Sequence, residues 1–447
     1  MKGISPIKFA ILIKSSDQLG HYKSLIEALR KRGHQVEVLF DRPSMPEDAL
    51  DYNWMLYRKG FWAGILSFTR DLLTHRRYLK AERQPYYRKR HLDLMFFWQR
   101  ALLKIPGAGL LLKTEVARLF LSWIEDAAPP CKDIVEQLKN FGVKAVIVPI
   151  GMKLYKLVGV EYLKAARHLG IKSFVPVATW DNLTTKGFIQ IIPDAVFAWN
   201  DYHKRECLEH HGIPKNKIHV IGSPFFDYWF SDFKPSVSRE SFFANYGLTP
   251  QDPFIVYLGS SAQIAKDESG LIQKFREDLD KADDESLRKI QIVIRPHPAN
   301  SKHYRHLKGI PGIFLIPEKG AVSSGDAEAA QLFYDTMHYS ICGVGINTSA
   351  MIDTIIFGKP VAAIIDKKYE KTQSETQHFR HLLAFDVLEL ASSNEEFRRI
   401  LKNLAFGNDT RAEKRMDFLK RFIRPRGLDI PASDLFAQKA EEIIQSG

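Results

Sequence analysis

The chain has 447 residues, 45% of them hydrophobic and 26% charged, which indicates a globular protein too long for one ordinary core. Its three cysteines, Cys131, Cys207 and Cys342, are too few and too scattered for a disulfide framework or a zinc site, so we expect a protein of the reducing cytoplasm. The formal net charge of +12 favours an anionic partner: a nucleic acid, an acidic lipid surface or a phosphorylated substrate.

The first apolar run, "IKFAILI" at 7–13, is interpreted as a strand. It is followed by "KSSDQLGHYKSLIEALRKRGH", which contains no small-residue cleavage site, so the run does not resemble a signal peptide. No stretch reaches the roughly 18 uninterrupted apolar residues of a membrane-spanning helix. We therefore expect a protein that does not span a bilayer.

Basic and aromatic residues are concentrated between about 55 and 115. Helical spacing there predicts an apolar face surrounded by Arg and Lys, made of Phe61, Trp62, Ile65, Leu66 and Phe68. This composition is typical of a helix that lies on an anionic membrane surface. It equally fits a helical insertion whose apolar face packs on the domain and whose basic face is solvated. We do not expect nucleic acid as the partner, because no recognised binding motif accompanies the charge.

Two series of predicted strands alternate with helices along the chain. The first series is "KFAILI", "QVEVLF", "KAVIVPI", "KSFVPV", "AVFAW" and "IHVIG", and the second is "FIVYLG", "QIVIRP", "GIFLIP", "YSICGV" and "PVAAII". Such alternation predicts two α/β domains with parallel sheets. The segment at about 224–253, rich in Pro, Ser and charge, is interpreted as the linker.

These patterns predict the domain organisation. We expect a Rossmann-like first domain at 1–235, with the basic helical insertion at about 53–140, and a second Rossmann-like domain at 240–420. The tail, 421–447, contains a short amphipathic helix capped at Ser433 or Asp434, which we expect to cross back to the first domain.

The stretch "GINTSAMIDTIIFGKP" at 345–360 predicts a strand end, a loop of small polar residues and a helix. Such a loop lies at the carboxyl end of a parallel strand, where a helix N-terminus offers N–H groups to a phosphate. Asp353 lies one turn after Ser349, so its carboxylate could reach the hydroxyls of a ribose beside that phosphate. The alternative is that Asn347, Thr348 and Ser349 only cap the helix.

Three segments together resemble the GT-B glycosyltransferase superfamily. The first, "SSDQLGHYKSLIEALRKRGHQVEVLF", resembles the opening of these two-domain enzymes, and the 345–360 stretch is similar to their donor-nucleotide loop and helix. The third, "IPDAVFAWNDYHKRECLEHHGIPKNKIHVIGSPFFD", ends in a Gly-x-Pro-x-x-Asp motif at Gly222, Pro224 and Asp227. It also resembles the end of the first domain in non-hydrolysing UDP-N-acetylglucosamine epimerases.

Within that superfamily, "RPHP" at 295–298 and "WDNLTTKGF" at 180–188 are similar to segments of CDP-glycerol glycerophosphotransferases and CMP-sugar capsule transferases. The chain departs from the usual patterns in two places. Asp353 stands where many nucleotide-sugar transferases have Glu, and Thr348-Ser349 stands where the glycerophosphotransferases usually have a Ser-Ser pair. The resemblance therefore leaves the nucleotide open.

The resemblance implies a donor-nucleotide site in the second domain. Hydrogen-bond donors aimed at the leaving phosphate would stabilise its developing charge. The candidate donor-binding residues are Arg295, His297, Pro298, Ser260, Ser261, Gly345, Asn347, Thr348, Ser349 and Asp353. No Asp-x-Asp pair ends a strand, so we expect no metal site and no cofactor other than the nucleotide-activated co-substrate.

The acceptor hydroxyl needs a general base, for which the first domain offers three candidates. His21 matches the Gly-His histidine of some GT-B families, and an imidazole with a pKa near 6.5 suits the role. Asp17 and Asp181 could orient His21 or replace it. Trp180 is interpreted as a packing residue.

The leading hypothesis is a metal-independent glycosyltransferase or glycerophosphotransferase. Its partners would be a nucleotide-activated sugar or glycerol and a cell-envelope polysaccharide or lipid-linked acceptor, with peripheral contact to the inner face of an anionic membrane through 55–115. One alternative is a sugar-nucleotide epimerase of the same fold. The other is a catalytically silent protein that binds an anionic polymer.

Overall fold

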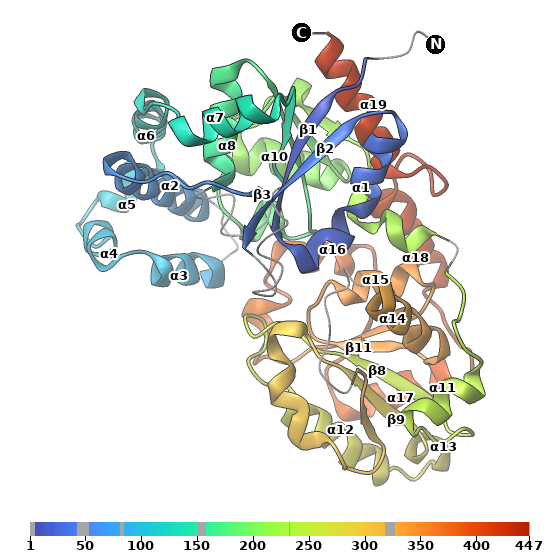
Figure 1. Ribbon diagram of the computed structural model, residues 1–447. Coiled ribbons are helices and arrows are strands. Elements are labelled where there is room, and N and C mark those ends of the chain that lie inside the picture. The colour runs from blue at the N-terminus through green and yellow to red at the C-terminus, as the bar shows by residue number, and fades with distance from the viewer. Residues whose placement is uncertain are drawn as a thin grey trace. The chain divides into compact units, whose positions relative to one another are not determined.

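The computed structural model describes residues 5–42, 53–80, 85–149, 158–231, 233–317 and 327–446. They form two compact α/β units (Figure 1). The first unit comprises Met1–Asp227 and Lys420–Gly447, and the second comprises Tyr228–Leu419. Each unit contains its own parallel sheet.

The sheet of the first unit has seven strands within the described residues, in the order β3-β2-β1-β4-β5-β6-β7. Their bounds are β1 (Lys8–Ser15), β2 (Gln35–Arg42), β3 (Asn53–Trp54), β4 (Ala145–Ile147), β5 (Lys172–Pro176), β6 (Ala195–Ala198) and β7 (Ile218–Val220). All neighbouring strands are parallel, with Ile11 opposite both Val38 and Ile147. The central strand β1 is almost wholly buried because helices cover both faces of the sheet.

The sheet of the second unit repeats this order with six described strands, β10-β9-β8-β11-β12-β13. Their bounds are β8 (Phe254–Leu258), β9 (Gln291–Arg295), β10 (Ile313–Leu315), β11 (Gly343–Gly345), β12 (Val361–Ile364) and β13 (Glu389–Ala391). Tyr257 of β8 lies opposite Ile294 on one side and Val344 on the other.

Each of the eleven predicted strands overlaps an observed strand, and the fold class is the predicted one. The run predicted at 339–344 overlaps least, because α14 (Ala327–Tyr339) includes its first residue and β11 begins at Gly343. The sequence missed β3 and β13, which are two and three residues long and lie at sheet edges. Edge strands this short carry no run of apolar residues, so their sequences have no detectable period.

The helices outside the insertion follow the strands in both units. In the first unit they are α1 (Leu19–Lys31), α7 (Lys132–Phe141), α8 (Val160–Leu169), α9 (Asn182–Thr185), α10 (Asp201–His211) and α19 (Ala432–Gln445). In the second unit they are α11 (Arg239–Tyr246), α12 (Ser269–Asp280), α13 (Glu285–Arg288), α14 (Ala327–Tyr339), α15 (Ala350–Ile356), α16 (Gln377–Ala384), α17 (Asn394–Ala405) and α18 (Ala412–Phe418).

Helix α17 illustrates why these sequences form helices. Ser393 caps its first turn by accepting a hydrogen bond from Glu396 N, and apolar side chains at helical spacing face the core. These are Phe397, Ile400, Leu401 and Leu404, all buried. They join the apolar residues of β8 and β9 in one cluster.

The tail belongs to the first unit, where α19 packs against α1 and places Phe436 in the core. The prediction that Ser433 or Asp434 caps α19 is wrong. Asp227 supplies the cap from the distant Gly-x-Pro-x-x-Asp motif, because its carboxylate accepts hydrogen bonds from Ala432 N at 3.1 Å and Ser433 N at 2.7 Å. The same carboxylate binds Arg424 Nη2 at 2.7 Å.

Gly222 of the motif lies where the returning tail passes closest. Its φ is +92°, and a Cβ there would lie 2.9 Å from the carbonyl oxygen of Ile423. Ser223 N donates to that same oxygen at 3.0 Å. The motif therefore marks the junction between the first unit and its C-terminal tail, which needs glycine for its backbone conformation and its close approach.

The segment predicted as a linker is instead largely part of the second unit from Tyr228 onward. Ser236 donates from its backbone N to Asp335 Oδ1 at 3.1 Å and from its hydroxyl to Oδ2 at 2.5 Å. The ring of Trp229 packs on Phe333 and Phe357. Aromatic packing and α11 therefore order a stretch whose Pro and Ser content is typical of a loop.

The described residues of the insertion form five helices before α7, which Figure 1 shows gathered to one side of the first unit's sheet. The insertion ends earlier than the predicted residue 140, because α7 packs against α8 of the first unit. They are α2 (Phe61–Lys80), α3 (Pro85–Leu94), α4 (Phe97–Leu103), α5 (Ala108–Lys113) and α6 (Glu115–Ala127). Helix α2 contacts α3, α5 and α6. None of the described helices is long and apolar enough to cross a membrane.

The basic side chains of α2 do not form a solvated face. Arg70, Arg76 and Arg77 are buried. Arg70 bonds Glu125 through Nε and Nη2, both at 2.7 Å, and its Nη2 also bonds Glu161 at 2.7 Å. The prediction that Arg and Lys surround α2 on a solvated face is therefore wrong for these residues. Carboxylates bind the guanidinium groups of Arg70 and Arg76, and backbone carbonyl oxygens bind that of Arg77.

Candidate functional site

In the second unit the candidate site lies where the strand order reverses. The chain runs from β8 to β9 and β10 on one side, then returns to β11 on the other side of β8. Open parallel sheets bind ligands outside the carboxyl ends of their strands at such a point. The loops that follow Leu258 of β8 and Gly345 of β11 therefore define the candidate site.

Two glycines allow these strand ends to lie close together. A Cβ on Gly345 would lie 2.9 Å from the carbonyl oxygen of Leu258. A Cβ on Gly259 would lie 2.8 Å from the hydroxyl of Tyr304 and 3.0 Å from His297 N. Larger residues would push the loops apart, so glycine is required at both positions.

Buried Glu268 holds the loop after β8. Its carboxylate accepts hydrogen bonds from Ser260 N at 2.7 Å, the Ser260 hydroxyl at 2.9 Å and the hydroxyls of Tyr304 and Tyr257 at 2.6 and 3.1 Å. Burial raises the pKa of Glu268, while the bonds from Tyr304 and Ser260 oppose that rise. Both donors of Ser260 are thus committed to Glu268, which gives Ser260 a supporting role and leaves the partly exposed Ser261 as the ligand-side residue.

Asn347 also faces inward. It is buried, and its Nδ2 donates to the carbonyl oxygen of Thr372 at 2.7 Å and lies 3.2 Å from Nε2 of His378. The hydroxyl of Thr372 donates in turn to the carbonyl oxygen of Ile264 at 3.0 Å. These bonds tie together the loops that follow β8, β11 and β12.

Thr348 and Ser349 remain at the surface of the site. Thr348 is partly exposed and Ser349 exposed, and the Ser349 side chain makes no capping bond to α15. Thr348 Oγ1 accepts one long bond, from Ala350 N at 3.4 Å. Helix capping therefore accounts for little of this polar stretch.

Arg295 and Asp353 interact at the edge of the same site. The Arg295 guanidinium lies over the Phe333 ring, with Cζ 3.8 Å from the centroid. Burial lowers the Arg295 pKa to about 10, and Asp353 opposes that change. Burial raises the pKa of Asp353 to about 7, against the effects of Arg295 and of a hydrogen bond from the Trp229 indole. Asp353 can therefore change charge near neutral pH.

His297 and Pro298 follow β9 directly. His297 is partly buried, and burial lowers its pKa. At pH 7 the imidazole is therefore neutral and can donate from one ring nitrogen only. Pro298 is exposed and begins a stretch of 3₁₀ turns, Pro298–Leu307.

In the first unit, His21 and Asp17 follow the carboxyl end of β1. Asp17 lies in the 3₁₀ turn Ser16–Gln18, and His21 is exposed in the first turn of α1. Because β1 adjoins β2 and β4, the first unit has its own strand-order reversal here. His21 is thus placed where ligands of parallel sheets bind.

Asp181 follows β5 and is held by its own turn. Its carboxylate accepts hydrogen bonds from the hydroxyls of Thr179 and Thr185, both at 2.6 Å, and Lys186 Nζ lies 3.4 Å away. Buried Arg77 of α2 donates to three carbonyl oxygens of the same turn. Arg77 of the insertion therefore fixes the turn. The contacts with Thr179, Thr185 and Lys186 give the Asp181 carboxylate a structural role in that turn.

The predicted residues thus form two groups at strand ends. The donor-site candidates share the carboxyl edge of the second sheet, and the base candidates share that of the first. The sequence missed Glu268, Trp229 and Gln373. Gln373 Nε2 binds the carbonyl oxygens of Ile346 and Ile364 at 2.7 and 2.8 Å. A single Glu or Gln in a polar loop carries no pattern that distinguishes it from a solvated residue.

Among the described residues, no group of three His, Cys, Asp or Glu side chains has an arrangement that could hold a metal ion.

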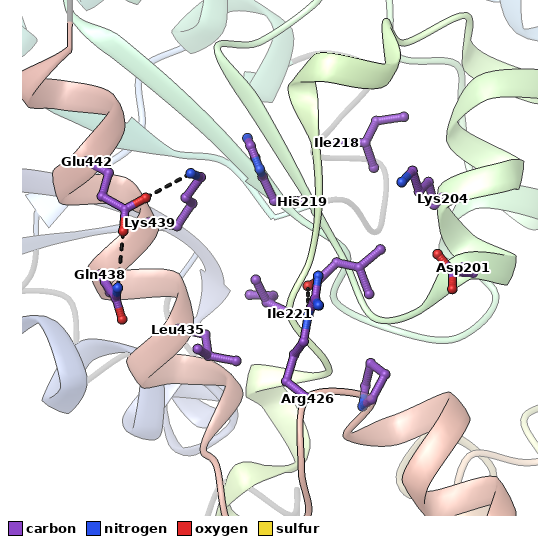
Figure 2. A pocket seen from close by; sticks show the side chains of 12 residues that line it. Asp201, Lys204, Ile218, His219, Ile221, Arg426, Leu435, Gln438, Lys439 and Glu442 are labelled. Atoms are coloured by element: carbon purple, nitrogen blue, oxygen red, sulfur yellow. Dashed lines mark hydrogen bonds and ion pairs between the residues drawn. The ribbon is translucent and has the colours of Figure 1, made fainter.

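A pocket of about 520 Å³ opens elsewhere, beside the edge strand β7 of the first unit. Figure 2 shows His219 of β7, Lys204 of α10, and Lys439 and Glu442 of α19 around it. Lys439 and Glu442 pair at 2.8 Å, and Arg426 Nε donates to the carbonyl oxygen of Val220 at 2.9 Å. None of the predicted site residues is among those that line this pocket.

Comparison with known proteins supports the fold at low sequence identity. No protein-family model and no curated protein matches the chain. A solved structure of a putative UDP-N-acetylglucosamine 2-epimerase from Listeria monocytogenes is similar over 99% of this chain and 98% of that chain, with 13% identity and a TM-score of 0.58. The S. aureus MnaA structure with UDP is similar over 98% and 97%, with 12% identity and a TM-score of 0.57.

The wall teichoic acid polymerase TagF is similar over 99% of this chain and 90% of that chain, with 10% identity and a TM-score of 0.50. Likenesses at these identities concern the fold alone. The chain has the GT-B fold, with two parallel-sheet α/β domains and a helical insertion in the first.

Proposed function

We propose that the protein transfers a sugar or glycerol phosphate from a nucleotide-activated donor to a cell-envelope polysaccharide or a lipid-linked acceptor at the inner face of a membrane. The observation that carries the proposal is the set of interlocked loops at the strand-order reversal of the second unit, with Arg295, His297 and Asp353 around it. The fold is shared with proteins whose structures are described with UDP or as a teichoic acid polymerase.

In this proposal the donor nucleotide binds to the second unit. Arg295 and the neutral His297 donate hydrogen bonds to the leaving phosphate, together with Ser261, Thr348 and Ser349. Ser260 and Asn347 have a supporting role, since their side chains hold the loops in place. Donors that are fixed before the reaction stabilise developing negative charge without reorganisation.

For a sugar, the acceptor oxygen forms a bond to the anomeric carbon while the bond from that carbon to the phosphate oxygen breaks. The nucleotide leaves with the electron pair of that bond. We propose His21 as the base that takes the acceptor proton, with Asp17 or Asp181 as alternatives. Asp181 is the weaker alternative, because two threonine hydroxyls already bind its carboxylate.

The test is thermal stability in the presence of CMP, CDP, UDP, GDP and ADP. A nucleotide present at 100 times its Kd stabilises the folded state by about 2.7 kcal/mol, so the one that binds should raise the melting temperature. We expect His297→Ala to abolish most of this rise. The matched control is His303→Ala, a partly exposed histidine that lies 3.8 Å from Asp267. No response to any nucleotide would contradict the proposal.

The second candidate is a sugar-nucleotide epimerase, favoured by the likeness to the Listeria monocytogenes structure. An epimerase converts its nucleotide sugar without an acceptor. Incubation with UDP-N-acetylglucosamine alone, followed by NMR of the sugar, separates the two candidates. A new epimer would favour the epimerase, and an unchanged donor would favour transfer.

A further inference from the structure

The outer face of the insertion exposes large apolar side chains on three consecutive helices, α4 to α6. Six of them are 58–77% exposed: Phe97, Leu110, Leu111, Val116, Phe120 and Trp123. Scattered exposed apolar residues are normal, but exposed apolar residues grouped on helices that contact one another, α4 with α5 and α5 with α6, mark an interaction surface. We call these six residues the outer apolar face.

Helix α6 is amphipathic with its apolar side turned outward. Val116, Leu119, Phe120 and Trp123 follow the i, i+3, i+4, i+7 spacing of one helix face, and all four are exposed. The rings of Phe120 and Trp123 stack with centroids 6.1 Å apart. An apolar stripe on a surface helix ordinarily faces the core, so this orientation needs a cause.

The cause is the opposite side of α6, which is fixed by buried groups. Glu125 is buried and bonded to Arg70 through two nitrogens at 2.7 Å. Leu121 is buried with Leu72 and Leu73 of α2. Since these contacts hold α6 in one rotation, the apolar stripe stays exposed.

The charge around the outer apolar face identifies its partner. Between residues 94 and 123 the basic residues are Arg100, Lys104, Lys113 and Arg118, whereas the only acidic residue is Glu115. Hydrogen bonds from Arg118, Lys80 and Arg76 hold the pKa of Glu115 at about 2, so its charge is offset by these partners. A second copy of the chain would bring two positive surfaces together, while an anionic lipid surface complements both the charge and the apolar residues.

We propose that the outer apolar face of α4, α5 and α6 inserts into the interfacial layer of an anionic membrane, with Arg100, Lys104 and Lys113 at the headgroups. This places the membrane contact on α4 to α6, of which α4 and α5 lie within the predicted 55–115 segment. The apolar face expected at 61–68 includes Leu66, which is buried. The biological purpose of this membrane contact rests on the proposed function, since it would bring the protein to a lipid-linked acceptor. Membrane binding itself requires no nucleotide. Its failure and that of the proposed function are therefore measured separately.

The test is flotation of the full chain with vesicles of phosphatidylcholine mixed with phosphatidylglycerol, and with vesicles of pure phosphatidylcholine. We expect binding to the anionic vesicles that salt weakens. The double variant Phe120→Gln, Trp123→Gln should bind the anionic vesicles roughly tenfold or more weakly than the wild type. The double variant Lys104→Gln, Lys113→Gln should also lose roughly tenfold or more in affinity for these vesicles. Phe406→Gln is the control, because Phe406 is 66% exposed in the second unit.

A fluorescent label gives a second measurement that does not depend on weakened variants. The three native cysteines are buried, so Leu110→Cys accepts an environment-sensitive dye selectively. Its emission should shift to the blue on anionic vesicles, whereas the same dye on Phe406→Cys should not respond.

Three results would overturn the inference. They are absence of binding to anionic vesicles, binding that is unchanged in the Phe120 and Trp123 double variant, and a wild-type dimer in light scattering that the double variant converts to monomer. The last result would show that a second copy covers the outer apolar face.

Discussion

The two units share one strand order but use their buried charges differently. In the first unit, Arg70 joins Glu125 and Glu161, so that buried ion pairs hold added helices beside the sheet. In the second unit, Glu268 binds Ser260, Tyr257 and Tyr304, so that a buried carboxylate holds the loops at the strand ends.

The difference shows how one topology acquires two tasks. Buried charges are stable only when they are paired or fully hydrogen-bonded, so each cluster rigidifies what it connects. In the first unit the rigid part is a layer whose outer face is apolar and basic. In the second it is the edge where parallel sheets bind ligands. The following changes test this contrast.

The largest effect is expected from Arg70→Met. The substitution leaves Glu125 and Glu161 buried without their shared cation, which typically costs 3–5 kcal/mol. Lys164 and Arg58 remain within 3.3 and 2.8 Å of these carboxylates, so we expect a loss of about 3 kcal/mol in the free energy of unfolding. Urea denaturation measures it, and nucleotide-induced stabilisation of the second unit should persist.

The control is Arg118→Met, which removes a cation from the exposed Glu115 and should change stability by less than about 1 kcal/mol. Equal losses in the two variants would contradict the role of burial. Loss of the nucleotide response in Arg70→Met would contradict the division of tasks between the units.

An intermediate effect is expected from Glu268→Gln. The amide nitrogen of glutamine is a donor and cannot accept the hydrogen bonds that Ser260 and Tyr304 donate. One or more of these bonds would therefore be lost, which would lower the free energy of unfolding by about 1–3 kcal/mol. Unlike Arg70→Met, this variant should also weaken nucleotide binding, measured by calorimetry with the nucleotide that stabilises the wild type. Glu277→Gln on the exposed face of α12 should change neither quantity. Unchanged binding in Glu268→Gln would separate the loop anchor from the site.

An effect that is visible as a pH dependence is expected from Asp353→Asn. Burial raises the folded-state pKa of Asp353 to about 7, above its ordinary value of 3.8, so the folded protein binds the proton more tightly than the unfolded chain. The stabilising contribution is complete below pH 4 and declines as pH rises to 7, by at most about 1.4 kcal/mol per pH unit.

Asp353→Asn should remove this decline, so the variant should lose less stability than the wild type between pH 4 and pH 7. Chemical denaturation across this range measures the difference. Parallel profiles for the two proteins would show that the carboxyl is not held protonated. Asp335→Asn is a poor control because Asp335 binds Ser236, whereas the exposed Asp283→Asn is suitable.

The sequence predicted much of the fold because buried parallel strands leave a strong signal. Runs such as "KFAILI" and "FIVYLG" became β1 and β8, and their alternation with helices predicted two parallel sheets. The short edge strands β3 and β13 left no such signal. The Gly-x-Pro-x-x-Asp motif was recognised, but its physical role, capping α19 through Asp227, depends on residues more than 200 positions away.

The candidate site was predictable only in part. Glycines and small polar residues after a strand indicated the loops of the second unit, and Arg295 and Asp353 both lie there. The sequence could not distinguish Ser261 from Ser260. The difference arises because Glu268 accepts hydrogen bonds from both donors of Ser260, and the local sequence does not indicate this contact.

By itself, then, the sequence determined most of the elements, their order and the presence of a basic aromatic insertion, because these depend on local periodicity and composition. Only the tertiary structure decided which charges are buried and which apolar residues face outward. Arg70 is basic and buried, while Trp123 is aromatic and exposed. The reason is that rotation of a helix is fixed by partners distant in sequence, here Arg70 and Glu125, and not by the helix's own pattern.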